Sequence, residues 1–175
     1  MVQEELSIQF YQPGQKNKKC QRVRGTDDLP VLIEEMTHLM KERNGVGLAA
    51  PQVGLDLQLA IVQLPTGKTH VLINPEIVNL GGKDVLGTES CLSLPPVERA
   101  TARVWRSEIA QVRSGTLENP EAAQLTVYKG AAARIVQHEI DHLDGIFFID
   151  RCQGIGRQIV LNAYKRFMRE SLTHD

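Results

Sequence analysis

The sequence predicts a single domain, residues 1–175, built from both helices and strands. A chain of this length is expected to form one domain with a substantial core. Apolar residues recur at helical spacing in three separate stretches, and strand-like runs lie between the first two of them. The middle helical stretch carries a His-Glu-x-x-His pattern, so we expect the function to be centred there.

The composition is ordinary for a soluble protein, with 42% hydrophobic and 23% charged residues. The net charge of -1 gives no electrostatic reason to expect a nucleic-acid or membrane-surface partner. No apolar run approaches the length of a membrane span, and the N-terminus lacks the basic and apolar regions of a secretory signal. The three cysteines are an odd number at unrelated spacings, which does not suggest a disulfide framework. We therefore expect a cytoplasmic protein.

Two helices are predicted at the two ends of the chain. The first begins near Leu29, where Pro30 suits the first turn, and it ends at Asn44 and Gly45. The second begins at about Ile155 and has both an apolar and a basic side. Its basic side is formed by Arg157, Lys165, Arg166 and Arg169. We expect that side to be solvated, with docking to the ribosome as the alternative.

Several strands are predicted between these helices. They cover residues 57–64, 70–73, 77–78, 102–112 and 122–128, with breaks at 74–75 and at 81–82. Trp105, the only tryptophan, is expected to be a packing residue. Residues 147–149 are expected to form a short buried strand or extended run.

A third helix is predicted over about residues 131–144, and it carries His138, Glu139 and His142. Residues four apart lie on the same face of a helix, so both imidazoles can reach one metal ion. Glu139 can reach a water bound to that metal and accept its proton. The alternative is a surface pair of histidines without metal. The apolar residues on both sides argue against it, because buried imidazoles and carboxylates need partners.

Such a metal site needs a third protein ligand and keeps a fourth position for water. One class of enzyme places a third histidine shortly downstream, but Phe148 stands at that position. A second class uses a downstream glutamate, and Glu170 falls in the C-terminal helix. Cys91 is the remaining candidate, since a thiolate is a good ligand and metal binding lowers its pKa.

Residues 45–52 form a second segment whose residue types suggest part of an active site. Two glycines within residues 45–52 indicate a sharp turn or a close approach of the backbone to another group. The segment ends in Gln52, whose amide is a neutral donor that can stabilise an oxyanion.

Together these stretches resemble the peptide deformylase family. The Gly-x-Gly-Leu-Ala-Ala-x-Gln motif of that family is matched by Gly45, Gly47, Leu48, Ala49, Ala50 and Gln52. The Glu-Gly-Cys-Leu-Ser motif is matched by Glu89, Cys91, Leu92 and Ser93. The Gln-His-Glu-x-Asp-His-x-x-Gly motif is matched by Gln137, His138, Glu139, Asp141, His142 and Gly145. The resemblance covers most of the chain, from about residue 29 to residue 150, with the motifs in the family's order.

The resemblance implies an α+β fold in which antiparallel β-strands are arranged around a central metal-binding helix, with an N-terminal and a C-terminal helix. It implies a metal-dependent hydrolase that removes the N-formyl group from the formyl-methionine of newly synthesised proteins and releases formate. The cofactor would be one divalent metal ion. Iron(II) is the metal that the resemblance implies, with zinc, nickel or cobalt as alternatives.

The resemblance also assigns roles to residues. The metal ligands would be Cys91, His138 and His142. Glu139 would be the general acid and base, while Gln52 and the backbone N–H of Leu92 would hold the developing oxyanion. The substrate would be bound as an added strand by the segments that contain Val46, Gly47, Thr88, Glu89 and Ser90.

The sequence also departs from the family pattern. Ser90 stands where the family usually has glycine, and serine is strained if the backbone there requires a positive φ. The segment from Cys91 to Arg99 is shorter than usual, and residues 102–128 form a longer region, which suggests an extended hairpin.

Two other functions stay open, the first because of these departures and the second because of the basic side of the C-terminal helix. One is a related amidase or peptidase with another acyl substrate. The other is a non-catalytic metal-binding or ribosome-associated protein, although such a protein would need neither Glu139 nor Gln52.

Overall fold

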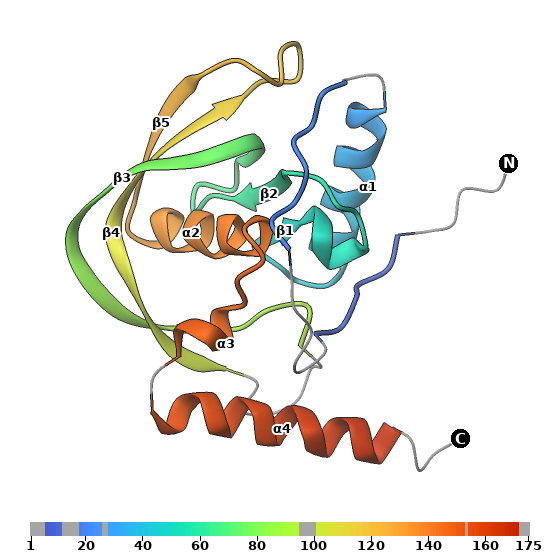
Figure 1. Ribbon diagram of the computed structural model, residues 1–175, viewed down its shortest axis with the longest axis vertical. Coiled ribbons are helices and arrows are strands. Elements are labelled where there is room, and N and C mark those ends of the chain that lie inside the picture. The colour runs from blue at the N-terminus through green and yellow to red at the C-terminus, as the bar shows by residue number, and fades with distance from the viewer. Residues whose placement is uncertain (1–5, 12–17, 26–27, 95–100, 153, 172–175) are drawn as a thin grey trace, which may run out of the picture.

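Five antiparallel strands form one sheet that curves around helix α2 in the computed structural model (Figure 1). The structure describes residues 6–11, 18–25, 28–94, 101–152 and 154–171. The strands are β1 (Gly47–Ala49), β2 (Leu59–Gln63), β3 (Thr69–Glu89), β4 (Ala102–Gly115) and β5 (Gln124–Lys129). The helices are α1 (Leu29–Glu42), the 3-10 helix η1 (Ala50–Val53), α2 (Ala131–Leu143), α3 (Phe148–Arg151) and α4 (Ile155–Ser171).

The strands follow the order β1-β2-β3-β4-β5, and every neighbouring pair is antiparallel. Figure 1 shows α2 in the centre, with the long strands β3 and β4 sweeping around it and with α1 and α4 at the periphery. This arrangement confirms the predicted α+β fold. Within the described part of the chain, no helix combines the length and apolar character needed to cross a bilayer.

Helix α2 is held inside the sheet by a stripe of apolar side chains. Ala133, Val136 and Ile140 recur at helical spacing and pack against buried residues of all five strands. Burying a side chain such as Ile140 contributes about 1.5–3 kcal/mol to folding. His138, Glu139 and His142 therefore lie on a helix whose position is fixed by packing against the sheet.

Strand β3 runs without interruption through both predicted breaks, so the prediction of separate short strands was wrong. Asn74 has φ of 49° and Gly82 has φ of 74°. The pairing with β4 shifts its register between Ile73 and Glu76 and again between Gly81 and Asp84. Turn-forming residues at these points bend the strand as bulges instead of ending it.

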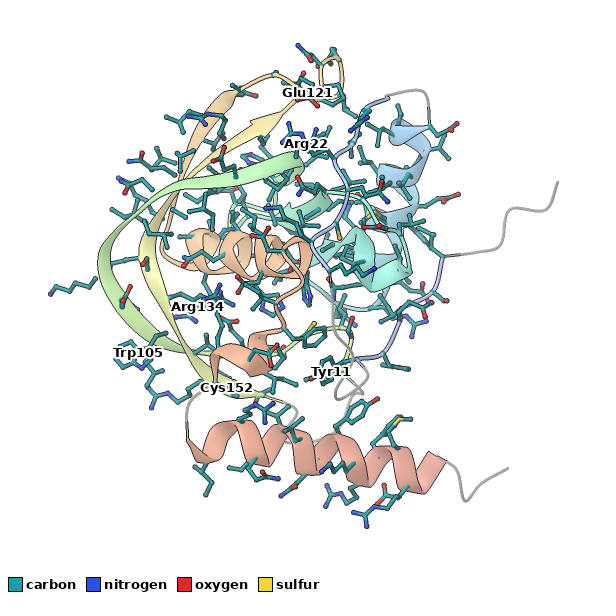
Figure 2. All side chains as sticks on the ribbon, viewed as in Figure 1. Tyr11, Arg22, Trp105, Glu121, Arg134 and Cys152 are labelled. Carbon is teal, nitrogen blue, oxygen red and sulfur yellow. The ribbon has the colours of Figure 1, made fainter. Side chains whose placement is uncertain are left out.

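Two smaller predictions also fail. Residues 147–149 are not a strand, because α3 begins at Phe148, and the Asp150 carboxylate accepts a hydrogen bond of 3.2 Å from the Phe147 N–H at its start. Trp105 is 52% exposed, whereas Val104 beside it is 1% exposed. Alternation along β4 places Trp105 on the outer face of the sheet, where Figure 2 shows it pointing away from the molecule.

Asn74 joins the N-terminal arm to the sheet and to the loop that connects β4 with β5. Its Oδ1 accepts from the Val23 N–H at 2.8 Å, and its Nδ2 donates to the carbonyls of Val23 and Pro120, both at 2.9 Å. The side chain is 5% exposed, so all three hydrogen bonds are shielded from water. Asparagine also tolerates the positive φ better than most residues.

We expect Asn74→Ala to lower the free energy of unfolding by about 3 kcal/mol. The substitution leaves buried partners on Val23 and Pro120 unpaired and places alanine at a positive φ. Urea unfolding monitored by circular dichroism would measure the loss. Asn79→Ala is the control, because Asn79 lies on the exposed part of the same strand and should change stability by no more than about 0.5 kcal/mol. Equal effects of the two substitutions would contradict this account of Asn74.

Candidate metal centre and active site

Three potential metal ligands converge where the end of β3 meets α2. His138 and His142 lie one turn apart on α2, and their Nε2 atoms are 3.2 Å apart. The Cys91 Sγ atom lies 3.3 Å from the Nε2 of His142. The three donor atoms all lie within 4.8 Å of one another. The structure thus brings together the three residues that the sequence predicted as ligands.

The donor set fits a small divalent cation. Ligand atoms around a tetrahedral ion such as zinc, with bonds of about 2.0–2.3 Å, are separated by roughly 3.4 Å, close to the separations at this site. Two imidazole Nε2 atoms that face each other also need a cation or a shared proton between them. One thiolate and two imidazoles suit iron, zinc, cobalt or nickel better than magnesium or calcium, which prefer oxygen ligands.

The two imidazoles differ in their affinity for a proton. Burial lowers the pKa of His138, but hydrogen bonds with Cys91 and Glu89 outweigh burial and raise it to about 10. Burial and the charge on His138 both lower the pKa of His142 to well below its ordinary value. The metal-free site therefore holds one positive charge on His138, in the place where a metal ion would compete with that proton.

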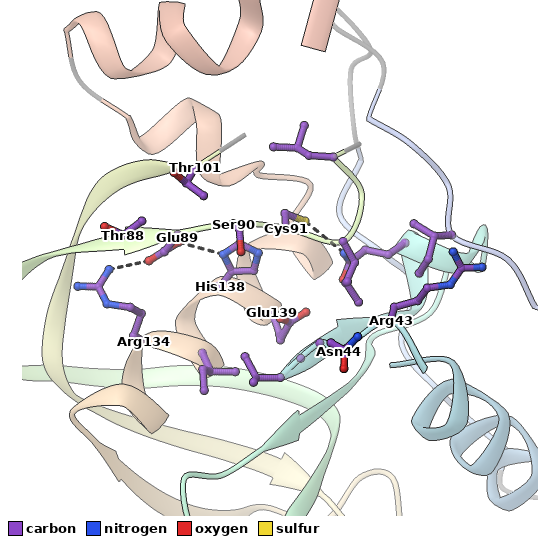
Figure 3. A pocket seen from close by; sticks show the side chains of 18 of the residues that line it. Arg43, Asn44, Thr88, Glu89, Ser90, Cys91, Thr101, Arg134, His138 and Glu139 are labelled. Carbon is purple, nitrogen blue, oxygen red and sulfur yellow. Dashed lines mark hydrogen bonds and ion pairs between the residues drawn. The ribbon is translucent and has the colours of Figure 1, made fainter. Parts of the chain in front are cut away.

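Glu89 fixes the orientation of His138. The Nδ1 of His138 lies 2.9 Å from a carboxylate oxygen of Glu89, which leaves Nε2 facing the other ligands (Figure 3). Arg106 donates two hydrogen bonds to the same carboxylate, at 2.9 and 3.0 Å, and Arg134 donates a third at 2.7 Å. Burial alone would raise the pKa of Glu89, but the hydrogen bonds from His138 and Arg106 hold it below its ordinary value. Glu89 therefore stays ionised as a partner of His138.

Glu139 has the properties expected of a general acid and base. Burial raises its pKa to about 7, with the charge on His138 acting in the opposite direction. Its Oε2 atom is buried and has no hydrogen-bond partner among the described residues. Gly47 makes room for this carboxylate, because a Cβ atom on Gly47 would lie 2.1 Å from Oε1 of Glu139. The close approach predicted from the glycines of this segment is therefore found at Gly47.

Gln52 presents its amide N–H groups to the same site. Its Oε1 accepts a hydrogen bond from the Ala49 N–H at 2.9 Å, which fixes the orientation of the amide. Its Nε2 lies 3.3 Å from Cys91 Sγ and 3.3 Å from Ser93 Oγ. Leu92 lies between these two residues, in a turn that the Leu94 N–H closes on the Cys91 carbonyl at 3.0 Å. The backbone of Leu92 thus joins the two residues whose side chains lie 3.3 Å from the Gln52 amide.

A cavity of about 610 Å³ opens onto these groups. Val46, Gly47, Thr88, Glu89 and Ser90, the residues that the sequence predicted for substrate binding, all line it. Within the described residues, a positive φ outside glycine occurs at Asn44 and Asn74, so the strain suggested for Ser90 is absent. The segment from Cys91 to Arg99, predicted to be shorter than usual, lies outside the described residues from position 95 onward.

Sequence reasoning missed the charged residues behind the ligands. Arg106, which is 5% exposed, bridges Glu89 and Asp141, and Arg151 pairs with Asp141 from the other side. These residues are far apart in the chain, so no local motif joins them. One signal was available: Arg106 occupies an inward position in the alternating pattern of β4, where a charge requires a partner.

A site with one thiolate, two imidazoles, a buried carboxylate of raised pKa and an amide donor defines a metal-dependent hydrolase. Comparison with known proteins identifies which one. A family model for polypeptide deformylase matches residues 7–158. The peptide deformylase of Desulforudis audaxviator is 39% identical over 148 residues, which are 85% of this chain and 93% of that protein.

Solved structures give the same result. The peptide deformylase of Thermus thermophilus superposes with a TM-score of 0.81 at 36% identity, covering 93% of this chain and 97% of that one. The enzyme of Synechococcus elongatus, in complex with actinonin, gives a TM-score of 0.80 at 34% identity, covering 95% of this chain and 87% of that one. The chain belongs to the peptide deformylase family, whose members are metal-dependent hydrolases that remove the N-formyl group from nascent polypeptides.

The raised pKa of Glu139 predicts how the stability of the metal-free protein depends on pH. The unfolded chain loses this proton near pH 4.5 and the folded protein near pH 7. Between these values the folded state binds more protons, so its stability falls as pH rises. The shift corresponds to a loss on the order of 3 kcal/mol by pH 8.

Glu139→Gln removes this titration, so the variant should gain stability relative to the wild type between pH 5 and pH 8. Urea unfolding of both metal-free proteins at the two pH values gives the measurement. Parallel pH dependences of the two proteins would show that Glu139 titrates normally in the folded state.

Proposed function

We propose that Glu139, Gln52 and the backbone N–H of Leu92 carry out deformylation beside a metal ion held by Cys91, His138 and His142. One observation carries the proposal. The unpartnered carboxylate oxygen of Glu139 and the amide of Gln52 lie at the same cavity as the candidate metal ligands. Structural packing alone requires neither group in that position.

The substrate peptide is proposed to bind as an added strand between two segments of the cavity wall. β1 is the edge strand of the sheet, and it pairs with β2 on one side only. Near its end, at Thr88 and Glu89, β3 pairs with β4 on one side, while its pairing with β2 is confined to residues 69–73. Backbone groups of Val46, Gly47 and Ser90 are therefore suited to pair with an extended peptide.

The catalytic roles follow from the chemistry of the residues. A bound divalent metal ion would supply an activated water and polarise the formyl oxygen. Glu139 accepts a proton from the attacking water and passes it to the leaving amine. Gln52 and the Leu92 N–H stabilise the oxyanion that develops on the formyl group, and such a donor is typically worth about 2.7–4 kcal/mol of the barrier.

Iron(II) is the proposed metal, with zinc, nickel or cobalt as alternatives that the same ligands can hold. A cytoplasmic location is also proposed. One reason is the substrate class, because formylated chains are newly made in that compartment. The other is the free thiols of Cys20, Cys91 and Cys152, which suit a reducing compartment.

Formate release from formyl-Met-Ala-Ser tests the assignment of Glu139. We expect the metal-loaded protein, purified without oxygen, to release formate. Glu139→Ala should reduce the rate by about 10²–10⁴-fold with its metal content unchanged, because the proton carrier is lost and the ligands are not.

Acetyl-Met-Ala-Ser is the control substrate, and we expect the wild-type protein to leave it intact. Equal hydrolysis of the acetyl and formyl peptides would favour a general amidase. A fully metal-loaded wild type that releases no formate would refute the proposed roles.

We further propose that α4 docks to the ribosome. Ile155, Ile159, Arg166 and Arg169 lie along one exposed face of α4, and Ile155 is 78% exposed. The basic side chains of this face can bind the phosphates of ribosomal RNA, and its apolar side chains can pack against a ribosomal protein. The basic residues predicted from the sequence are thus on an accessible part of the helix.

Co-sedimentation with ribosomes tests this docking. We expect binding that weakens as salt increases and that is lost in the double variant Arg166→Glu, Arg169→Glu, because phosphate contacts are screened by salt and repelled by carboxylates. Formate release from a free tripeptide should be unchanged in that variant. Absence of the wild-type protein from the ribosome pellet at low salt would refute the docking proposal.

A further inference from the structure

Helix α3 packs against the two imidazoles of the candidate metal centre. The ring of Phe148 stacks on that of His138, with centroids 5.6 Å apart and planes inclined by 30°. The ring of Phe147, directly before α3, meets His142 edge-on, with centroids 5.0 Å apart. Phe147 and Phe148 are 6% and 1% exposed. The rotation of each imidazole is therefore limited by an aromatic ring from this segment.

Arg151, the last residue of α3, ties the helix to α2. Its Nε and Nη2 donate to the two oxygens of Asp141, both at 2.5 Å. Asp141 lies on α2 directly before His142 and is 4% exposed. A bidentate pair fixes both distance and angle, so it orients α3 as well as attaching it.

Asp141 is also part of the chain of charges that reaches His138. Arg106 donates to Asp141 at 2.5 Å and holds Glu89 through two further hydrogen bonds. Glu89 in turn pairs with Nδ1 of His138 at 2.9 Å. Arg151 thus acts on His142 through the packing of Phe147. It acts on His138 both through the packing of Phe148 and through this chain of charges.

Neutralising Asp141 does not by itself require Arg151, because Arg106 already pairs with that carboxylate. The side chain of Arg151 is 43% exposed, whereas that of Asp141 is 6% exposed. Arg106 contacts Asp141 through one hydrogen bond, and the partly exposed Arg151 adds a bidentate contact to this buried carboxylate. The second arginine therefore contributes position more than charge compensation. The contact fixes where α3 lies against α2.

We propose that Arg151 is a positioning residue for the metal centre. By pairing with Asp141, it holds α3 in the place where Phe148 and Phe147 keep His138 and His142 directed at a common ion. This inference rests on the metal site of the proposed function, and it concerns how tightly and in what geometry that site holds a metal.

The test uses the cobalt(II)-substituted protein and two variants of Arg151. Arg151→Met keeps a long side chain without charge or donors, and Arg151→Lys keeps the charge without the fork. The measurements are the visible absorption spectrum of bound cobalt(II) and the rate at which a chelator removes it. We expect Arg151→Met to release cobalt about 10-fold faster, at the lower end of the roughly 10–100-fold effect of groups that orient metal-binding histidines. Arg151→Lys should fall between Arg151→Met and the wild type.

Arg113→Met is the matched control. Arg113 also pairs with a carboxylate, that of Glu76 at 3.2 Å, and its side chain is 49% exposed, but it lies on the outer part of β4. Its cobalt spectrum and release rate should match those of the wild type. A loss of stability alone would change the unfolding midpoint in either variant but would not shift the cobalt spectrum.

Arg151→Ala with added ethylguanidinium provides a second measurement. The partial exposure of Arg151 lets the small cation enter the space that the substitution leaves, so it should restore slow cobalt release, whereas ethylammonium should not. Wild-type spectra and release rates in Arg151→Met, or rescue by both cations alike, would overturn the proposal. Neither readout requires catalysis, so a failure of the proposed deformylation would leave the result interpretable.

Discussion

The carboxylate of Glu89 is the group on which the rest of the site depends. It accepts hydrogen bonds from His138, Arg106 and Arg134 while being only 6% exposed. Removing one partner from such a network typically costs about 3–5 kcal/mol, because the remaining charges stay buried without compensation. A buried ion pair adds little net stability compared with apolar packing. The property that the network secures is therefore the orientation of His138, with Nδ1 held by Glu89 and Nε2 directed at the other ligands.

The curvature of β3 brings this carboxylate to α2. A straight strand of 21 residues would be about 70 Å long, whereas a globular chain of 175 residues is roughly 40 Å across. The strand must therefore bend, and it does so at Asn74 and Gly82, where the register with β4 shifts. After these bends Glu89, the last residue of β3, reaches His138 on α2, and Cys91 just beyond it reaches His142. Asn74 and Gly82 resemble loop formers in the sequence, but in the structure they bend β3. This bending allows one strand to contribute residues to both the core and the site.

The part of the site that was predictable is the part encoded by local spacing. His138 and His142 share a helix face because they are four residues apart, and that geometry holds in any α-helix. The choice of Cys91 required elimination and a family resemblance, because a thiol 47 residues upstream carries no spacing rule. The partners of Asp141 were not predictable in this way. Arg106 and Arg151 reach it from β4 and α3, and only the tertiary fold makes them neighbours.

The fold shows the same division. The helices were predicted because each repeats its apolar residues over three or more turns, which is a long signal. Residues 147–149 are too few for periodicity to distinguish strand from helix, and the cap supplied by Asp150 decides for helix. The prediction that Trp105 is a packing residue was wrong for a different reason. Composition suggests that tryptophan is buried, but the alternation along β4 assigns the inner face to Val104 and Arg106 and leaves Trp105 outside.

Gly47 and Ser90 show why one cavity wall requires glycine and the other does not. At Gly47 the constraint comes from a side chain, since a Cβ atom there would overlap the carboxylate of Glu139. At Ser90 the backbone has no positive φ, and the residue is exposed. Because successive side chains of an extended segment point to opposite faces, the inward direction of Glu89 turns Ser90 away from the charged network. Serine therefore changes the lining of the cavity at a position outside the charged network that orients His138.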